Sequence, residues 1–455
     1  MHHDSGTFTE GSVRANIFRL AWPMMIAQIV GVLYNIVDRM FIGHMPEIGG
    51  EALTGLGVVF PLITLFNAFA NLAGQGGTSY FAIARGRESD DEAKKIQGNA
   101  LYMLLVMSAG LMLVSYVFET PLLKMFGGSE TTIPYASEYM RIYVLGTFFQ
   151  LISLGMNPFL GAQGFATIGM LSIVIGAVVN LILDPIFIYW MKLGVRGAAI
   201  ATVISQAVSA AWTLLFLTGK RANVRIDRQS LSPDKYHISQ IFVLGFANFV
   251  FQLTNTLTLA VSNKVLLRYG GDVQVGVMTV VMSIRQVFSM PVNATSNASK
   301  PFLSFNYGAG EGKRVVAGIR LILGFCLVLT TLSSIVIVSF PRFFLKVFTS
   351  DAGIIEAGPL PLQIYFACFL FMSFQMVGQA TFTSLGFPKE ATFFSLLRKV
   401  FLVVPLTLLL PKIPALGVLG VYLAETISQV VGGTACFSTM WHRIGRKLQK
   451  NKPIR

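Results

Sequence analysis

Polar residues at helical spacing interrupt two otherwise apolar stretches of the chain. Asn35 and Asp38 are three residues apart, and Asn180 and Asp184 are four apart, so each pair lies on one face of a helix. Thr202 adds a hydroxyl in the next apolar stretch. Two carboxylates with amide and hydroxyl oxygens can coordinate a sodium ion, or share a proton between them. The pattern therefore predicts a cation site.

A structural role is the alternative for the same residues. Asp38 would then pair with a nearby arginine, and Asp184 would satisfy the backbone that Pro185 interrupts. Charged groups within hydrocarbon are costly and occur mainly where they face a cavity or a partner. Because a similar spacing occurs in two separate stretches, we favour the functional interpretation.

The composition shows what kind of element must hold these residues. Of 455 residues, 54% are hydrophobic and only 12% are charged, with a mean hydropathy of +0.65. A soluble domain has about 25% charged residues, so this chain is not a water-soluble globule. The 37 Phe and 19 Met exclude disorder, because they would have to stay hydrated. The sequence is that of a membrane protein.

Twelve apolar runs reach the length of about 20 residues that a helix needs to cross a bilayer. They lie near 15–42, 53–82, 96–118, 135–157, 164–190, 197–218, 238–265, 274–302, 316–340, 357–382, 390–411 and 416–440. This predicts an all-α polytopic membrane protein with twelve transmembrane helices.

The loops that share a side with the N-terminus contain most of the Lys and Arg, including the basic stretch 219–237. Such a bias marks the cytoplasmic side, so both termini are expected there. The basic residues of the cytoplasmic loops then account for the net charge of +14, and no nucleic-acid partner is expected. No Ser/His/Asp or Cys/His arrangement indicates an enzyme, and no cofactor or structural metal is predicted.

The two halves of the chain repeat at a shift of 222 residues, or 223 beyond one insertion. The matching segments are 85–86 with 307–308, 163–164 with 385–386, 194–197 with 417–420, and 201–206 with 424–429. We therefore expect two pseudo-symmetric six-helix lobes, an N-lobe over 1–220 and a C-lobe over 221–455 that includes the linker. Parallel repeats are typical of transporters that rock two lobes about a central site, although channels also arise by duplication.

The second half does not repeat the two carboxylates, because Ala260 and Leu406 stand at the equivalent positions. Its charges within spans are Arg285, Lys300, Arg398 and Glu425. Glu425 aligns with Thr202, and we expect it to pair with Arg398 or Arg285, in a role that is either structural or functional.

Several motifs together resemble those of the multidrug and toxic compound extrusion (MATE) transporters. They are Leu20-Ala21-Trp22-Pro23, residues 35–43, residues 180–185 and residues 301–309. The resemblance covers essentially the whole chain and is strongest to the prokaryotic branch of the DNA-damage-inducible protein F type. It implies a V-shaped pair of helix bundles around a central cavity. It also implies export of organic cations or polyaromatic drugs across the bilayer of a bacterial or archaeal plasma membrane, in exchange for protons or sodium ions. We expect a monomer.

The resemblance also assigns roles to single residues. Cation coupling, through H+ or Na+, falls to Asp38, Asn180, Asp184 and Thr202. Substrate binding falls to Tyr34, Asn35, Asn157 and Gln206, and the first span would bend at Pro23. Polar candidates in the second half are Gln252, Arg285, Arg398 and Glu425. One departure is Lys300, a positive charge where the family usually has glutamine before Pro301.

Two other functions remain open. A flippase for a lipid-linked precursor would use a cationic cavity to hold phosphates. The basic side chains of Arg285, Lys300 and Arg398 are consistent with that alternative. A passive channel would conduct regardless of Asp38 and Asp184. The acidic and amide-rich first half favours the exporter of cations.

Overall fold

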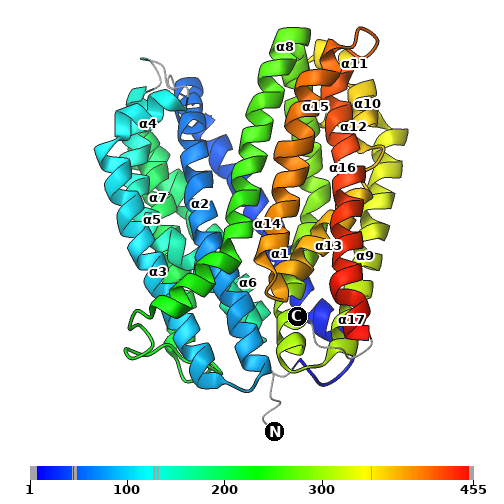
Figure 1. The fold of residues 1–455 in the computed structure, drawn as a ribbon. Helices are drawn as coiled ribbons and strands as arrows, with labels where there is room; N and C mark the ends of the chain where they lie inside the picture. Colours follow the sequence, from blue (N-terminus) through cyan, green and yellow to red (C-terminus); the bar gives the residue numbers. More distant parts are fainter. Residues whose placement is uncertain are drawn as a thin grey trace. The chain divides into compact units, whose positions relative to one another are not determined.

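The computed structural model describes residues 8–43, 45, 49–126, 130, 133–349 and 351–449, except the side chains of Asn35, Ile36, Arg39, residues 49–55 and Gln449. Over these residues the chain is a series of helices without a strand (Figure 1). The chain divides into two compact units. The first contains Trp22–Gly245, and the second contains Phe8–Ala21 together with Phe246–Arg455.

The first unit is a bundle of long helices. Its elements are the main part of α1 (Val13–Gly43), α2 (Gly49–Gly86), α3 (Asp90–Val117), α4 (Glu119–Met125), α5 (Ile133–Ala162), α6 (Ala166–Pro185), the π-helical turn η1 (Ile186–Trp190) and α7 (Gly194–Thr218). Helix α5 packs against α2, α3, α6 and α7, and these helices run alongside one another in Figure 1.

The second unit repeats this plan with more interruptions. After α8 (Lys235–Gly308) come α9 (Gly312–Ser339), α10 (Pro341–Phe348), α11 (Ala352–Ala357), α12 (Pro359–Phe366), α13 (Phe371–Ser384), α14 (Pro388–Leu396), the π-helical η2 (Leu397–Val403), α15 (Val404–Leu409), the 3-10 turn η3 (Leu410–Lys412), α16 (Leu419–Met440), the π-helical η4 (Trp441–Gly445) and α17 (Arg446–Gln449). Helix α16 packs against α12, α13, α15 and η2.

All twelve predicted runs fall on helices. In the described chain nine helices are long and apolar enough to cross a membrane, and α12 with α13, bent by 45°, form a tenth candidate. Helix α8 holds two runs, on either side of a kink at Gly271, where φ is +65°. Large apolar side chains such as Leu113, Leu215 and Phe340 are exposed, as expected of surfaces that face lipid. The predicted all-α polytopic fold is confirmed.

The internal repeat is visible in the backbone. Helices α2 and α8 end at the equivalent residues Gly86 and Gly308. Equivalent glycines also adopt positive φ: Gly164 at +88° with Gly386 at +82°, and Gly194 at +54° with Gly417 at +46°. Glycine reaches this backbone region without the strain that other residues incur. Each half therefore makes its turns with the same local geometry.

The compact units do not meet at the boundary that the sequence suggested, between residues 220 and 221. The linker 219–237 is hydrogen-bonded to the first unit: Gln163 pairs with both backbone groups of Val224, and Asn99 accepts from Asp234 N and donates to Ser232 O. Lys94 also forms an ion pair with Asp227 at 2.5 Å, and its hydrogen bond lowers the pKa of Asp227. That the two halves move as lobes stays a prediction.

The N-terminal segment belongs to the second unit. Arg314 donates hydrogen bonds to the carbonyls of Phe8, Glu10 and Gly11, and Asn306 donates another to Phe8. The Phe8 ring is buried and packs edge-on against Phe305, with centroids 5.5 Å apart. The start of α1 is thus fixed to α8 and α9.

Small residues allow α2 and α5 to approach closely. A Cβ placed on Gly74 would lie 2.6 Å from the carbonyl oxygen of Gly155, whereas one placed on Gly57 of the same helix would meet nothing within 4 Å. The close approach at Gly74 is typical of helix packing in membranes.

We expect Gly74→Ala to lower the stability of the protein by about 1–3 kcal/mol, because the added methyl must push two backbones apart. Gly57→Ala is the matched control, and it should leave stability unchanged or raise it by up to about 1 kcal/mol through helix propensity. Thermal unfolding of both purified variants in detergent measures the difference. Equal melting temperatures would contradict the close packing of α2 on α5.

Candidate functional site

The predicted cation-site residues come from three helices of the first unit. Asp38 lies on α1, Asn180 and Asp184 lie one turn apart near the end of α6, and Thr202 lies on α7. The end of α1 is held to η1 by a hydrogen bond of 2.6 Å from the Tyr189 hydroxyl to Phe41 O. We call Asp38, Asn180, Asp184 and Thr202 the acidic site.

The structure brings the four side chains together in a buried place. Asn180 Nδ2 donates to Asp184 Oδ1 at 3.2 Å and to Thr202 Oγ1 at 3.5 Å. The carboxyl groups of Asp38 and Asp184 lie close enough to interact electrostatically. All four residues are less than 9% exposed. Two carboxylates this close repel one another unless a proton or a cation lies between them.

The structural alternative gains no support from Asp184. Its Oδ1 accepts from a side chain, not from the backbone, and its Oδ2 is buried with no hydrogen-bond donor among the described residues. Asp184 therefore does not cap the interrupted end of α6. That the acidic site binds a cation stays a prediction.

Tyrosines that the sequence analysis did not single out extend the acidic site along α5. Tyr139 lies near Thr202, and its ring stacks on Tyr143 with centroids 5.5 Å apart. Gln206 Nε2 in turn donates to the Tyr143 hydroxyl at 3.3 Å. The signal in the sequence was the spacing of Tyr139 and Tyr143, four residues apart and hence on one helix face.

The predicted substrate residues are distributed more widely. Tyr34 lies near both Asp38 and Asp184, and Gln206 reaches the acidic site through the tyrosines. Asn157 instead donates to Gly169 O at 2.9 Å, which ties α5 to α6. The side chain of Asn35 lies outside the described part of the chain.

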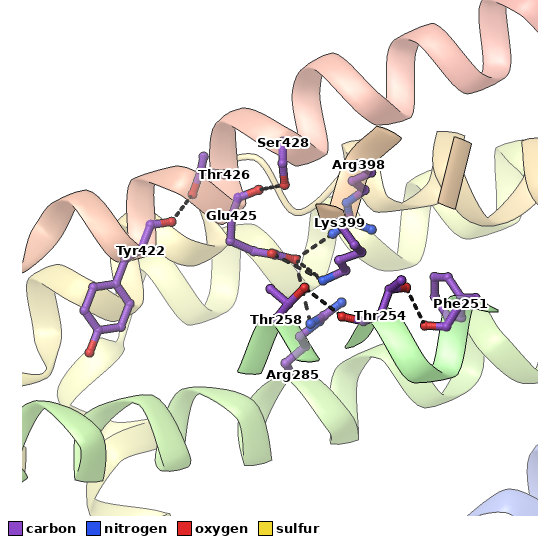
Figure 2. Close-up of polar contacts among 10 residues, drawn as sticks. All are labelled: Phe251, Thr254, Thr258, Arg285, Arg398, Lys399, Tyr422, Glu425, Thr426 and Ser428. Carbon is purple, nitrogen blue, oxygen red and sulfur yellow. Dashed lines mark hydrogen bonds and ion pairs between the residues drawn. The ribbon is translucent and has the colours of Figure 1, made fainter. Parts of the chain in front are cut away.

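A second polar cluster lies inside the second unit, around Glu425 of α16. Arg398 Nη2 donates to Glu425 Oε1 at 2.6 Å, Lys399 Nζ lies 3.1 Å from the same oxygen, and Arg285 Nη1 lies 3.8 Å from it. Figure 2 shows the three basic side chains, from η2 and α8, converging on the carboxylate. We call Arg285, Arg398, Lys399 and Glu425 the basic cluster.

Both predicted pairs with Glu425 are therefore present, and Lys399 was missed. Neighbouring residues point about 100° apart in an α-helix, so Arg398 and Lys399 were not expected to reach one carboxylate. Their long side chains both reach it from η2, which is π-helical, and such insertions are frequent at functional sites.

Three other candidates lie outside both clusters. Gln252 is half-buried on α8. Its backbone carbonyl accepts a hydrogen bond from the Thr256 hydroxyl. Lys300 is buried farther along α8 at 6% exposure, so it does not reach water by extending along the helix. Pro23 lies inside α1, next to the boundary between the two units at Ala21 and Trp22. Its part as a hinge stays a prediction.

The MatE family model matches residues 23–186 and again residues 247–409. The multidrug export protein MepA of Staphylococcus haemolyticus is 23% identical over 78% of each chain, and an FAD transporter of Shewanella oneidensis is 26% identical over 94% of this chain and 95% of its own. A MATE crystal structure in the bent conformation superposes with a TM-score of 0.92 at 24% identity, over 99% of each chain.

Removing the carboxylate of the basic cluster should destabilise the protein strongly. We expect Glu425→Gln to cost about 3–5 kcal/mol, because three buried cations would lose their partner. The control is Glu390→Gln, which breaks a more exposed ion pair with Arg443 and should cost at most about 1 kcal/mol. Thermal unfolding in detergent compares the two, and equal losses would show that the basic cluster is not held by Glu425.

Proposed function

The chain belongs to the MatE family of multidrug and substrate efflux transporters, and on this premise we propose that it exports small organic molecules in exchange for protons or sodium ions that bind at the acidic site. The observation that carries the proposal is the pair of buried carboxyl groups, Asp38 and Asp184, which lie close together beside Asn180 and Thr202. Such a pair releases free energy when a cation enters, and so its occupancy can bias a conformational equilibrium.

Both coupling ions suit the residues present. A proton would be shared by the two carboxyl groups, whereas a sodium ion would take oxygens from Asp38, Asp184 and Thr202, with the amide of Asn180 beside them. The hydrogen bonds from Asn180 to Asp184 and Thr202 orient these oxygens toward one another. Preorganised oxygens lower the cost of binding an ion of either kind.

Export requires that the ion and the substrate favour different conformations. A ligand that binds both conformations equally shifts nothing, however tightly it binds. We therefore assign ion binding to the conformation that releases substrate outward, with α1 bending near Pro23. Tyr34 lies next to the acidic site, and Gln206 is connected to it through Tyr143. Both residues would respond to its occupancy and contact the substrate.

The substrates that we assign are organic cations or polyaromatic drugs. The acidic residues of the first unit and the similarity to MepA, a multidrug export protein, support this class. The FAD transporter among the relatives and the basic cluster support a second class, aromatic compounds with an anionic group. A lipid-linked phosphate, moved by a flippase, belongs to the same second class.

The proposed setting is the plasma membrane of a bacterium or archaeon, with both termini in the cytoplasm. The excess of Lys and Arg in the loops on that side supports this orientation. The protein would act as a monomer surrounded by lipid.

We expect Asp184→Asn to abolish gradient-driven export while leaving the fold intact, because the amide cannot take up the coupling ion. The assay uses proteoliposomes loaded with a fluorescent organic cation, with pH and sodium gradients imposed separately. The matched control is Glu138→Gln, which removes a carboxylate of an exposed ion pair in the same unit and should transport normally.

The gradient that drives wild-type movement identifies the ion. Full transport by Asp184→Asn would refute coupling at the acidic site and favour a passive channel. No movement of the organic cation under either gradient would move the assignment to the second substrate class.

A further inference from the structure

We infer that the basic cluster is a binding site for an anionic group, a phosphate or a carboxylate, carried by an aromatic small molecule. That this ligand is a transported substrate rests on the proposed function. The site itself follows from the side chains of the second unit.

The charges of the basic cluster do not balance. Three cations surround one carboxylate, and the exposed fractions of their side chains are 16% for Arg285, 1% for Arg398 and 3% for Lys399. A buried ion pair is tolerated when each charge has a partner, and an excess charge in a low dielectric is costly. The excess positive charge of the cluster would therefore be reduced by binding a further anion.

Hydrogen-bond donors are also left over. Arg398 uses Nη2 for Glu425, whereas its Nε and Nη1 are buried and make no hydrogen bond with the described residues. An arginine carries five N–H donors in a planar fork that fits the oxygens of a carboxylate or phosphate. Unused buried donors are rare in proteins, since each one loses its hydrogen bonds with water and gains none in return.

Two buried amide groups near Arg398 also have unused hydrogen-bonding atoms. Gln375 of α13 and Gln429 of α16 are both buried, and neither side-chain N nor O has a hydrogen-bond partner in the described chain. Helices α13 and α16 pack on each other there, as a Cβ on Gly433 would lie 3.7 Å from Gln375 N. Arg398 packs its alkyl stem against Gly432 of the same helix. Two buried amides without partners therefore lie on α13 and α16, and α16 packs against η2, which holds Arg398.

The local backbone favours a functional origin for this arrangement. Arg398 and Lys399 both reach Glu425 from the π-helical turn η2, a local form that is frequent at functional sites. A purely structural pair needs one cation, and here three are brought in from η2 and α8. Glu425 then serves to hold the cations apart and oriented while an anion is absent.

The more exposed end of the cluster suits an aromatic ligand. Arg285 is its most exposed member, and its guanidinium lies 6.0 Å from the centre of the Tyr365 ring. In Figure 2 Thr254 and Thr258 lie beside Arg285, and Thr258 donates to Thr254 O at 2.7 Å. Tyr365 itself is fully buried, so the surface on which a flat ligand can stack is the guanidinium plane of Arg285. A ring attached to an acidic group would use this plane.

The test measures binding of two fluorescent probes with the same ring. Riboflavin 5′-phosphate carries a phosphate and riboflavin does not. The full chain is placed in nanodiscs of phosphatidylcholine, and fluorescence anisotropy gives both dissociation constants. We expect the phosphate probe to bind at least about tenfold more tightly, since charge-assisted hydrogen bonds to arginine are strong.

Three variants connect the preference to the cluster. Arg398→Gln should remove most of the preference for the phosphate probe, while Arg342→Gln, the same change at an exposed residue of α10, should leave it unchanged. Arg398→Lys keeps the charge and the partner of Glu425 but loses the fork, so it should fold and still weaken binding of the phosphate probe severalfold. Unchanged binding in both Arg398 variants would overturn the inference, as would equal affinity for the two probes.

Two further arms identify the source of the anion. Loss of probe binding when phosphatidylglycerol replaces phosphatidylcholine would support the site and assign it to a lipid headgroup. Competition by inorganic phosphate at the affinity of the probe would support the site and assign it to the free anion.

Asp184→Asn separates this inference from the proposed function. The variant should bind the phosphate probe like the wild type even though coupled transport is lost. Loss of binding in Asp184→Asn together with unchanged binding in Arg398→Gln would place the anion elsewhere and overturn the inference.

Discussion

A charge inside a membrane must be compensated within the protein, because hydrocarbon offers neither water nor counterions. Both polar clusters of this chain follow from that constraint. In the acidic site two carboxyl groups have an amide, a hydroxyl and each other as neighbours. In the basic cluster three cations share one carboxylate. In each cluster the protein compensates the charges only in part. Each cluster therefore favours a ligand of the opposite charge.

The two clusters also show how a duplicated chain diverges. The halves keep the same turns, with glycines at positive φ in equivalent places. The position on α7 that holds Thr202 corresponds to the position on α16 that holds Glu425. At one polar position of a common scaffold, the first half has a hydroxyl among carboxylates and the second has a carboxylate among cations. Backbone geometry has thus been retained while the sign of the local charge was reversed.

Much of this arrangement was predictable from the sequence, for physical reasons. The spans followed from length and hydropathy, and the faces of Asp38 and of Asn180 with Asp184 followed from helical spacing. The pairs of Glu425 with Arg398 and Arg285 followed because a buried charge needs a partner. Lys399 was missed because helical spacing does not show how far a long side chain bends to reach a buried carboxylate. The hydrogen bonds of the linker to Gln163 and Asn99 could not be predicted, because they join residues far apart in sequence.

The attachment of the N-terminal segment has a consequence for the order in which the protein is made. Phe8 leaves the ribosome before its partners Asn306 and Arg314, which follow about 300 residues later. Contacts at such separation form slowly, because a long loop must close first. The first unit, apart from the start of α1, can assemble from its own residues as they emerge. The second unit is complete only when the segment Phe8–Ala21, made earlier, packs on it, so the beginning of α1 must stay available until α8 and α9 have been inserted.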